Sequence, residues 1–305
     1  MNILITGGAG FIGSHIAETL IENHHNVTIL DNLSTGNKKF IPEGAEFIND
    51  DIRSSSIESL FRSRHFDAVY HEAAQLLVPV SIADPKFDAD ENIMGMLNIL
   101  EAARKNGVRK IIFSSSAAVY GDNPNLPLTE TEPPEPASPY GLTKWMTENY
   151  LKLYHRLYGL NYTILRYSNV YGPRQGSSGE GGVIYHFAKA LAKGEPVTIY
   201  GDGKATRDFI FVRDVAAANL EALDKADNRI MNISSNSEIS IHDLALRMIR
   251  ISGKTVPVIY KPARAGDILH SRLSNEEAEK RMKWTPRTSV DIGLESVNRY
   301  FENNG

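Results

Sequence analysis

A tyrosine and a lysine stand one helical turn apart at Tyr140 and Lys144. Residues at this spacing lie on one face of a helix, so the phenol and the ammonium group can be neighbours. Free tyrosine has a pKa of about 10 and is a poor base at neutral pH, but nearby cations favour the phenolate form. Ser116, which ends a serine-rich run upstream, could share a substrate proton with Tyr140. These three side chains predict a site that removes a proton from a hydroxyl group.

A glycine loop near the start of the chain is suited to hold a dinucleotide. Gly7, Gly10 and Gly13 have the spacing G-x-x-G-x-x-G between a first strand and a helix. Such a loop lets the backbone approach a pyrophosphate, and the helix N-terminus offers free N–H groups. Asp31 ends the second predicted strand, where a carboxylate binds the adenosine ribose and repels a 2′-phosphate. Either feature alone also fits an ordinary turn, but together they favour NAD over NADP and place a hydride acceptor beside the predicted base.

Short apolar runs alternate with helical patterns through the first half of the chain. The runs are continuous, which indicates strands buried on both faces of a parallel sheet. This order predicts an α/β fold, with a doubly wound parallel sheet of the Rossmann type. The predicted strands are Ile3–Thr6, Val27–Leu30, Ala68–His71, Lys110–Ser114 and Tyr162–Tyr167, and the predicted helices are Ile12–Glu22, Asn92–Asn106 and Tyr140–Tyr158, the last with Ser138 as N-cap and Pro139 in its first turn.

The character of the chain changes after Gly172. Residues 175–182 are rich in glycine and serine and predict a mobile loop, and the elements beyond are shorter and mixed. We expect helices at Val183–Lys193, Ile241–Ser252 and Val290–Asn303. The chain therefore divides into an NAD-binding part, residues 1–172, and a smaller mixed α/β part that binds the substrate, residues 173–305. Strands near Phe209 and Met231, within residues 205–235, are candidates to return to the main sheet.

Composition excludes several classes of function. The net charge is −4, without a basic patch, so nothing indicates a nucleic-acid partner. The absence of cysteine excludes disulfides, thiolate nucleophiles and cysteine-ligated metals. His71 has no second His or Cys at ligand spacing, so we expect a packed histidine and no metal. No apolar stretch is long enough to cross a bilayer and the chain does not start like a signal peptide, which predicts a cytoplasmic protein without a membrane partner.

The motifs, taken in order, resemble the extended short-chain dehydrogenase/reductase family, within its NAD-dependent nucleotide-sugar epimerase/dehydratase group. The resemblance covers nearly the whole chain. It is carried by residues 6–13 (TGGAGFIG), 31–34 (DNLS), 71–74 (HEAA), 114–121 (SSSAAVYG), 140–144 (YGLTK), 165–173 (LRYSNVYGP), 207–209 (RDF) and 264–267 (RAGD).

The resemblance implies roles for individual residues. The implied catalytic residues are Ser116, Tyr140 and Lys144. The implied NAD contacts are Gly7, Gly10, Phe11, Ile12, Gly13, Asp31, Asn32, Ser34, Thr35, Gly36, Asp51, Ile52, Ala73, Ala74, Gln75, Asn92, Ser114, Tyr140, Lys144 and Tyr167. The implied contacts of a UDP-sugar are Ser116, Asn169, Val183, Tyr200, Arg207, Arg264, Asp267 and Ser271. The arginines suit a diphosphate, and an aromatic ring can stack on uracil.

Ala117 and Ala118 bear on the class of reaction. In the similar sugar 4,6-dehydratases these positions carry an Asp-Glu pair that eliminates water, and in related glucuronate decarboxylases the second is Glu. Methyl groups cannot exchange protons, so the resemblance favours oxidation followed by re-reduction, as in 4-epimerisation of a UDP-hexose. Tyr140 would take the 4-OH proton while C4 gives a hydride to NAD. The 4-keto sugar would then turn over and receive the hydride on its other face.

The preferred sugar and the assembly are less determined. Ser271 falls where similar epimerases restricted to UDP-glucose and UDP-galactose tend to carry tyrosine, so UDP-GlcNAc and UDP-GalNAc are further candidates. UDP-glucuronate 4-epimerisation and other NAD-dependent nucleotide-sugar oxidoreductions stay open, as does a non-catalytic dinucleotide-binding module. Relatives often dimerise through two helices, which implies a homodimer through residues 92–106 and 143–158. Core burial explains the apolar spacing of these helices equally well.

Overall fold

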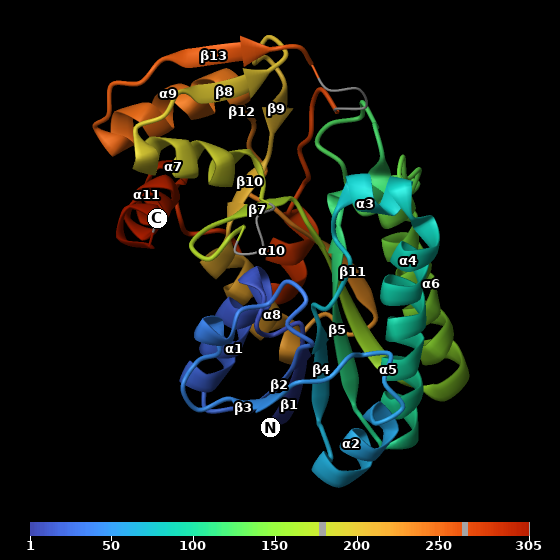
Figure 1. The fold of residues 1–305 in the computed structure, drawn as a ribbon. Helices are drawn as coiled ribbons and strands as arrows, with labels where there is room; N and C mark the ends of the chain where they lie inside the picture. The colour runs from blue at the N-terminus through green and yellow to red at the C-terminus, as the bar shows by residue number, and fades with distance from the viewer. Residues whose placement is uncertain (177–180, 264–267, 305) are drawn as a thin grey trace.

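A parallel sheet of seven strands forms the centre of the larger part of the molecule (Figure 1). This computed structural model describes residues 1–176, 181–263 and 268–304. The strand order is β11-β6-β5-β4-β1-β2-β3, and it reverses between β1 and β4, where open α/β sheets bind ligands. The strands are β1 (Asn2–Thr6), β2 (Asn26–Leu30), β3 (Glu46–Ile48), β4 (Ala68–His71), β5 (Lys110–Ser116), β6 (Asn161–Tyr167) and β11 (Arg229–Ile233).

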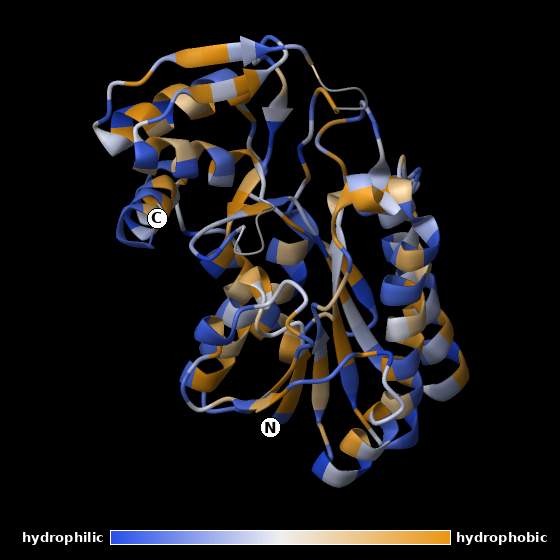
Figure 2. Ribbon diagram, viewed as in Figure 1, coloured by the Kyte–Doolittle hydropathy of each residue, from blue (hydrophilic) through white to orange (hydrophobic). Residues whose placement is uncertain are grey.

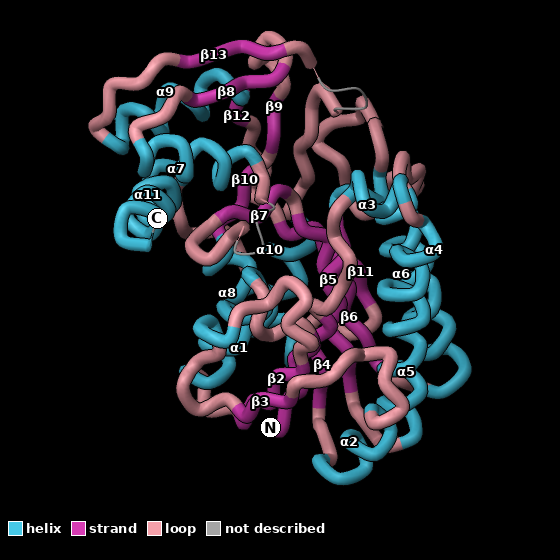
Figure 3. Tube along the Cα trace, viewed as in Figure 1, coloured by secondary structure: helices cyan, strands magenta, loops and turns pink. Residues whose placement is uncertain are grey.

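Helices cover both faces of this sheet (Figure 3). One face carries α1 (Phe11–Glu22), α8 (Val212–Asp224) and α10 (Glu276–Met282), and the other carries α2 (Ile57–Arg64), α5 (Gly95–Lys105) and α6 (Pro139–Tyr158). Alternate residues of β1 serve the two faces, since Ile3 and Ile5 lie in one core and Leu4 in the other. All three are fully buried. The predicted doubly wound fold is confirmed, and the hydrophobic strands stand out at its centre (Figure 2).

The helix that carries the predicted base begins as its sequence indicates. The Ser138 side chain accepts a hydrogen bond from the Gly141 N–H at 3.1 Å, and Pro139 is the first helical residue. The helix ends at Gly159, which has a φ of 72°. Glycine adopts this left-handed conformation without steric cost, so it closes the helix at this point.

The helix expected over residues 92–106 has a different start. Helix α4 (Pro85–Ala89) leads through a wide π-type turn (Asp90–Met94) directly into α5. In that turn the buried Asn92 side chain donates to the Gln75 carbonyl oxygen and to the Thr143 hydroxyl. The wide turn therefore directs a polar side chain into the protein at the point where it is needed.

A smaller mixed α/β part follows, as predicted. It contains α7 (Val183–Lys193), α9 (Ile241–Ser252) and α11 (Val290–Asn304) around a separate apolar core, with β8 (Val197–Tyr200) paired to β13 (Val258–Lys261). Met231 returns to the main sheet through β11, but Phe209 does not. Its strand β10 (Phe209–Phe211) pairs with β7 (Asn169–Tyr171), because β11 already occupies the edge of β6. Across the described residues, no helix is both long and apolar enough to cross a membrane.

Candidate active site

The predicted catalytic side chains meet at the carboxyl end of β5. Ser116 is the last residue of that strand, and Tyr140 and Lys144 lie at the start of α6. The buried Lys144 Nζ donates to the Ser114 carbonyl oxygen at 2.8 Å and lies 5.9 Å from the centre of the Tyr140 ring. The end of β5 thus fixes the ammonium group beside the phenol, as the helical spacing predicts.

The protein by itself does not prepare the phenol as a base. Burial raises the pKa of Tyr140 to about 12, while a hydrogen bond with Ser116 lowers it and the charges of Asp88 and Glu72 raise it. Burial also lowers the pKa of Lys144, against the attraction of Glu72 and Asp88. The phenolate therefore needs a further positive charge in the site, and the oxidised nicotinamide ring carries one.

The glycine loop leaves no room for side chains. A Cβ on Gly13 would lie 2.4 Å from the Gly7 carbonyl oxygen, and one on Gly7 would lie 2.6 Å from the Ala73 nitrogen. Gly10, the N-cap of α1, has no capping side chain. The first N–H groups of this helix therefore face the loop without a side-chain acceptor, which is the arrangement that binds a phosphate.

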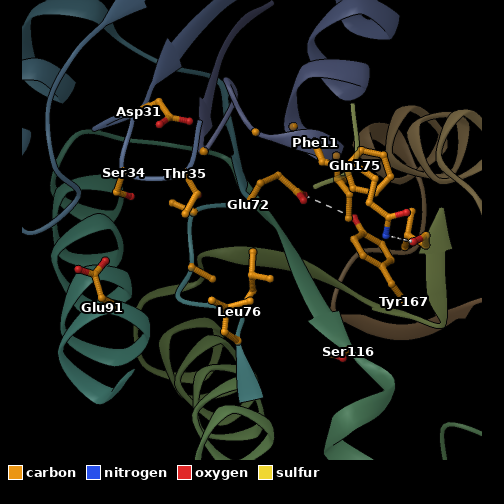
Figure 4. A pocket seen from close by; sticks show the side chains of 18 of the residues that line it. Phe11, Asp31, Ser34, Thr35, Glu72, Leu76, Glu91, Ser116, Tyr167 and Gln175 are labelled. Atoms are coloured by element: carbon orange, nitrogen blue, oxygen red, sulfur yellow. Dashed lines mark hydrogen bonds between the residues drawn. The ribbon is translucent and has the colours of Figure 1, made fainter. Parts of the chain in front are cut away.

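A cavity of about 400 Å³ runs over this loop (Figure 4). Ser116 lies on its wall. The predicted NAD contacts on the same wall are Gly7, Gly10, Phe11, Ile12, Gly13, Asp31, Asn32, Ser34, Thr35, Ile52, Ala73, Ala74, Tyr140 and Tyr167. The structure thus brings the glycine loop, the acidic end of β2 and the predicted base together around one space.

Two other predicted NAD contacts support the wall from behind at its Asp31 end. A Cβ on Gly36 would lie 2.7 Å from Oδ1 of Asp31, so glycine lets this loop close over the carboxylate. Asp51 accepts hydrogen bonds from Asn32 Nδ2 at 2.8 Å and from Arg53. Asp50 lines the cavity in place of Asp51.

The remaining predicted NAD contacts, Gln75, Asn92, Ser114 and Lys144, are buried and do not line the described part of this cavity. The Gln75 N–H donates to Asn92 Oδ1 at 2.8 Å, and both side-chain amides donate to the buried Asp88. These bonds join the loop after β4 to the π-type turn. We infer that these hydrogen bonds position the cavity wall. The Ser114 carbonyl oxygen holds the Lys144 ammonium group.

A second cavity, of about 680 Å³, opens beside the first. The two share wall residues Val170, Gln175, Gly181 and Gly182. The predicted UDP-sugar contacts on the second wall are Asn169, Val183, Tyr200 and Arg207. Arg207 belongs to the short strand β9 (Thr206–Arg207), and its Nη1 donates to the Thr206 carbonyl oxygen at 2.8 Å. A ligand can therefore reach from this cavity to the proposed base.

Three predicted substrate contacts are not placed on these walls. Arg264 and Asp267 lie outside the described residues, as do residues 177–180 of the predicted mobile loop. Ser271 is half-buried and does not line the described part of either cavity. Its segment contacts β9. The Leu269 carbonyl oxygen, two residues before Ser271, accepts a hydrogen bond from the Thr206 N–H at 2.8 Å.

Comparison with known proteins identifies the family. Residues 3–234 match the model of the NAD dependent epimerase/dehydratase family. The chain belongs to this family. The match includes the glycine loop, Asp31 and the Tyr140–Lys144 pair, and it confirms the resemblance that the sequence motifs indicate.

Three solved structures are similar to the whole chain. A UDP-glucose 4-epimerase from Thermotoga maritima, with UDP-glucose, is 43% identical, covers 100% of this chain and 99% of its own, and has a TM-score of 0.97. A Thermus thermophilus UDP-glucose 4-epimerase in complex with NAD is 40% identical, covers 99% of both chains and has a TM-score of 0.93. A UDP-N-acetylglucosamine 4-epimerase from Methanobrevibacter ruminantium, in complex with UDP-N-acetylmuramic acid, is 37% identical, covers 100% and 99%, and has a TM-score of 0.95.

NAD is the cofactor of this epimerase/dehydratase family, and the first cavity fits it. The glycine loop and the uncapped α1 form a cradle for its pyrophosphate. Asp31 accepts hydrogen bonds from the N–H groups of Ala9 at 3.0 Å and Leu33 at 2.8 Å, which fix the carboxylate on the cavity wall. Its negative charge favours the free 2′-hydroxyl of NAD over the phosphate of NADP.

Replacing Asp31 with serine is expected to weaken NAD binding about tenfold and to improve NADP binding relative to NAD by at least that factor. The adenosine ribose of NAD loses a charged hydrogen-bond acceptor, worth about 1.5–3 kcal/mol. The 2′-phosphate of NADP is no longer repelled. Titration calorimetry with each dinucleotide measures both effects. Asp122→Ser, an exposed position outside both cavities, is the control. An unchanged ratio of the two affinities in the Asp31 variant would contradict this role.

Asp208 anchors the segment that carries Arg207. Its buried carboxylate accepts hydrogen bonds from the Ser235 N–H at 3.0 Å and the Leu273 N–H at 3.2 Å. Burial raises the pKa of Asp208 to about 6 from its ordinary value of 3.8, against the lowering effect of Ser235. The Asp208 carboxylate thus connects the segments that contain Arg207, Ser235 and Leu273. Its burial disfavours the ionised form.

This pKa predicts a pH-dependent stability. Between pH 3.8 and pH 6 the folded protein binds more protons at Asp208 than the unfolded chain does, so this group favours folding more as the pH falls. Relative to Asp208→Asn, we expect the wild-type protein to gain about 1 kcal/mol of unfolding free energy between pH 7 and pH 5. Urea unfolding of both proteins at the two pH values measures the difference. A difference that does not change with pH would contradict the raised pKa.

Several residues of the first cavity were not predicted from the sequence as contacts, including Asp50, Glu72, Leu76, Glu91 and Gln175. Glu72 could have been identified from the sequence, because a carboxylate interrupts a small apolar motif at the end of a strand. Nothing in the sequence marks Glu91 or Leu76 as cavity residues, since a surface helix or loop explains them equally well.

His71 is packed, as predicted. Its Nδ1 lies 2.9 Å from the Thr6 hydroxyl, its ring stacks on Phe113, and burial lowers its pKa to about 3. The ring is therefore neutral and part of the core. Within the described residues, no group of three or more His, Cys, Asp or Glu side chains is arranged to hold a metal ion.

Proposed function

We propose that the protein is a UDP-sugar 4-epimerase, which interconverts the two C4 epimers of a UDP-hexose. The observation that carries this proposal is the position of Ser116 and Tyr140 on the wall of the NAD cavity, beside the second cavity with Arg207 and Tyr200. A nucleotide sugar bound there would present its hexose to the base. The similarity to UDP-glucose 4-epimerases solved with UDP-glucose and with NAD supports it.

In the proposed reaction Tyr140 accepts the proton of the sugar 4-hydroxyl while Ser116 holds the oxygen. NAD supplies the hydride acceptor, and later the donor, when it is bound. Lys144, held by the Ser114 carbonyl, stabilises the phenolate. After the 4-keto sugar has turned over, Tyr140 returns its proton to the oxygen and Arg207 retains the diphosphate.

Ala117 and Ala118 favour epimerisation over elimination of water. They begin a short 3-10 turn (Ala117–Tyr120) immediately after Ser116, and the Ala118 N–H donates to the Ser116 hydroxyl at 3.1 Å. No proton can pass through their methyl side chains. These two positions therefore supply neither acid nor base for dehydration.

We propose that the sugar range includes UDP-glucose and UDP-galactose and extends to UDP-GlcNAc and UDP-GalNAc. The resemblance associates a small residue at position 271 with the larger 2-acetamido group, although Ser271 does not line the described part of either cavity. The 37% identity to a UDP-N-acetylglucosamine 4-epimerase supports the extension. Both ligands, NAD and a nucleotide sugar, are cytoplasmic metabolites, and we propose that the protein acts in that compartment.

The test is an incubation of the purified protein, without added cofactor, with UDP-glucose and separately with UDP-GlcNAc. Proton NMR of the anomeric region follows each mixture. The expected products are UDP-galactose and UDP-GalNAc. UDP-galactose alone would retain the reaction and contradict the extended range. No product from either substrate, even with NAD added, would reject both and direct the next assay to UDP-glucuronate.

We also propose a homodimer through α5 and α6, which lie side by side (Figure 1). Apolar side chains are exposed on α4, the π-type turn and α6, including Phe87, Met94, Met146, Leu157 and Tyr158. Such a surface is typical of an interface. Sedimentation equilibrium of the wild-type protein and of Met94→Glu tests the proposal, since a charge at this position should favour the monomer. A wild-type monomer would reject it.

A further inference from the structure

Glu72 is a carboxylate on the wall of the first cavity, the one that fits NAD. It follows the last residue of β4, is half-buried, and points toward Tyr167 across the cavity (Figure 4). Ser116 and Tyr140 line the same cavity. Glu72 therefore lies in the part of the site where the chemistry takes place, and away from the Asp31 end.

Two hydroxyl groups are directed at this carboxylate. The Ser114 hydroxyl donates a hydrogen bond to Glu72 Oε1, and the Tyr167 hydroxyl lies 3.5 Å from the same oxygen. Asn219 Nδ2 donates to the Tyr167 oxygen at 2.8 Å, which leaves the Tyr167 proton free to face Glu72. An ionised carboxylate accepts hydrogen bonds only, so this arrangement of donors suits the charged form of Glu72.

The charge of Glu72 has no partner in direct contact. Among the ion pairs of the described residues, none includes Glu72, although Glu91 and Asp51, near the other end of the cavity, both pair with Arg53. The Lys144 ammonium group, which is bound to the Ser114 carbonyl oxygen, acts on Glu72 through its charge. Burial raises the pKa of Glu72, while the Ser114 hydrogen bond and the Lys144 charge lower it. A cation in the cavity would favour the ionised form further.

In the proposed reaction the nicotinamide ring would bind at the part of the cavity that Glu72 lines together with Ser116 and Tyr140. A hydride passes directly from the sugar carbon to the ring, so the ring would have to lie beside the carbon whose hydroxyl faces Tyr140. The oxidised ring is positively charged. When it accepts a hydride, which brings two electrons, it becomes neutral, and the hydroxyl proton goes to Tyr140. The electrostatic partner of Glu72 is therefore present before hydride transfer and absent after it.

We propose that Glu72 is the counterion of the oxidised nicotinamide ring and shifts the bound cofactor toward its oxidised form. A fixed charge near the ring changes the relative affinity for the two redox forms. This inference rests on the proposed epimerase function, in which the cofactor must return its hydride in every cycle. By favouring the oxidised ring, Glu72 drives the hydride back to the 4-keto sugar and keeps the reduced enzyme from accumulating.

The test measures dissociation constants of NAD⁺ and NADH separately, for the full chain freed of nucleotide and without any sugar. Glu72→Gln keeps the size of the side chain and an oxygen acceptor for Ser114 but removes the charge. We expect its ratio of NAD⁺ to NADH dissociation constants to rise about tenfold, which corresponds to about 30 mV for a two-electron couple. Glu72→Asp, which keeps the charge, should stay within about twofold of the wild-type ratio.

Glu46→Gln is the matched control. It makes the same change at an exposed carboxylate that is already paired with Arg64 and lines neither described cavity. Its ratio should equal that of the wild type. Equal weakening of both redox forms by Glu72→Gln, or no change in either, would overturn the proposal. If Glu72→Gln does not fold, Glu72→Met removes the charge with a side chain that adapts to irregular spaces, and the same ratio decides.

The outcome is independent of the sugar chemistry. Binding of the two redox forms can be measured even if neither UDP-glucose nor UDP-GlcNAc is a substrate. If the ratio of dissociation constants rises as expected in Glu72→Gln but the protein epimerises neither sugar, only the proposed function is rejected. An epimerase with an unchanged ratio in Glu72→Gln would reject the counterion alone.

Discussion

Replacing Tyr140 with phenylalanine is expected to lower kcat for UDP-glucose about 1,000-fold, within the roughly 10²–10⁴-fold range of general acid–base catalysis. The ring stays in place beside Lys144, so the change removes the phenolic oxygen and little else. KM should change by less than about threefold, because the proposed UDP contacts lie on the wall of the second cavity. Steady-state rates from proton NMR measure both constants.

Tyr150→Phe is the matched control for this prediction. Tyr150 lies on the same helix, is half-buried and lines neither described cavity. Its kcat should stay within about twofold of the wild type. Both variants should retain NAD, because the glycine loop and Asp31 are unchanged. A Tyr140 variant with more than about a tenth of the wild-type kcat would exclude this residue as the base.

The sequence predicts best those elements whose surroundings are uniform. Strands β1, β2, β4, β5 and β6 are mostly buried on both faces, so continuous apolar runs identify them without knowledge of their neighbours. The short edge strand β3, which is only partly buried, was not predicted. Helix α6 combines an N-cap, Ser138, with a terminal Gly159, and its whole span was therefore predictable. The Tyr140–Lys144 pair follows from the same helix, because its geometry is local.

Elements that depend on distant partners were not predictable in this way. Strand β10 has the apolar sequence of a sheet strand, but which partner it takes depends on β11 already occupying the edge of β6. The π-type turn before α5 exists because Asn92 bonds to residues of two other segments, Gln75 and Thr143. Local periodicity identifies neither the strand that pairs with β10 nor the residues that bond to Asn92. The same limit explains why Asp50, and not its neighbour Asp51, reaches the cavity.

One more long-range interaction, in the core beside the site, cannot be predicted from the sequence. Arg166, near the end of a predicted buried strand, forms a bidentate ion pair with Glu148 of α6, with N···O distances of 2.9 and 2.6 Å. Both side chains are buried. Glu148 also accepts a hydrogen bond from the Ser115 hydroxyl at 2.7 Å. The pair thus joins β6, α6 and the serine-rich end of β5, one turn beyond Lys144.

Glu148→Ala is expected to lower the free energy of unfolding by about 3–5 kcal/mol, because it leaves the Arg166 guanidinium buried without its counterion. Urea unfolding at neutral pH measures the change. The double variant Glu148→Met with Arg166→Leu should be more stable than Glu148→Ala, since it removes both charges and fills the space with apolar atoms.

A surface ion pair provides the comparison that separates burial from charge. Asp291 lies 3.3 Å from Arg247 and 3.4 Å from Arg250, and all three side chains are well exposed. Asp291→Ala should therefore cost less than about 1 kcal/mol. If Glu148→Ala costs no more than Asp291→Ala, the buried pair does not hold α6 against the sheet. A large cost that the double variant relieves would show that the loss comes from leaving the Arg166 charge buried without its counterion, and not from losing a favourable ion pair.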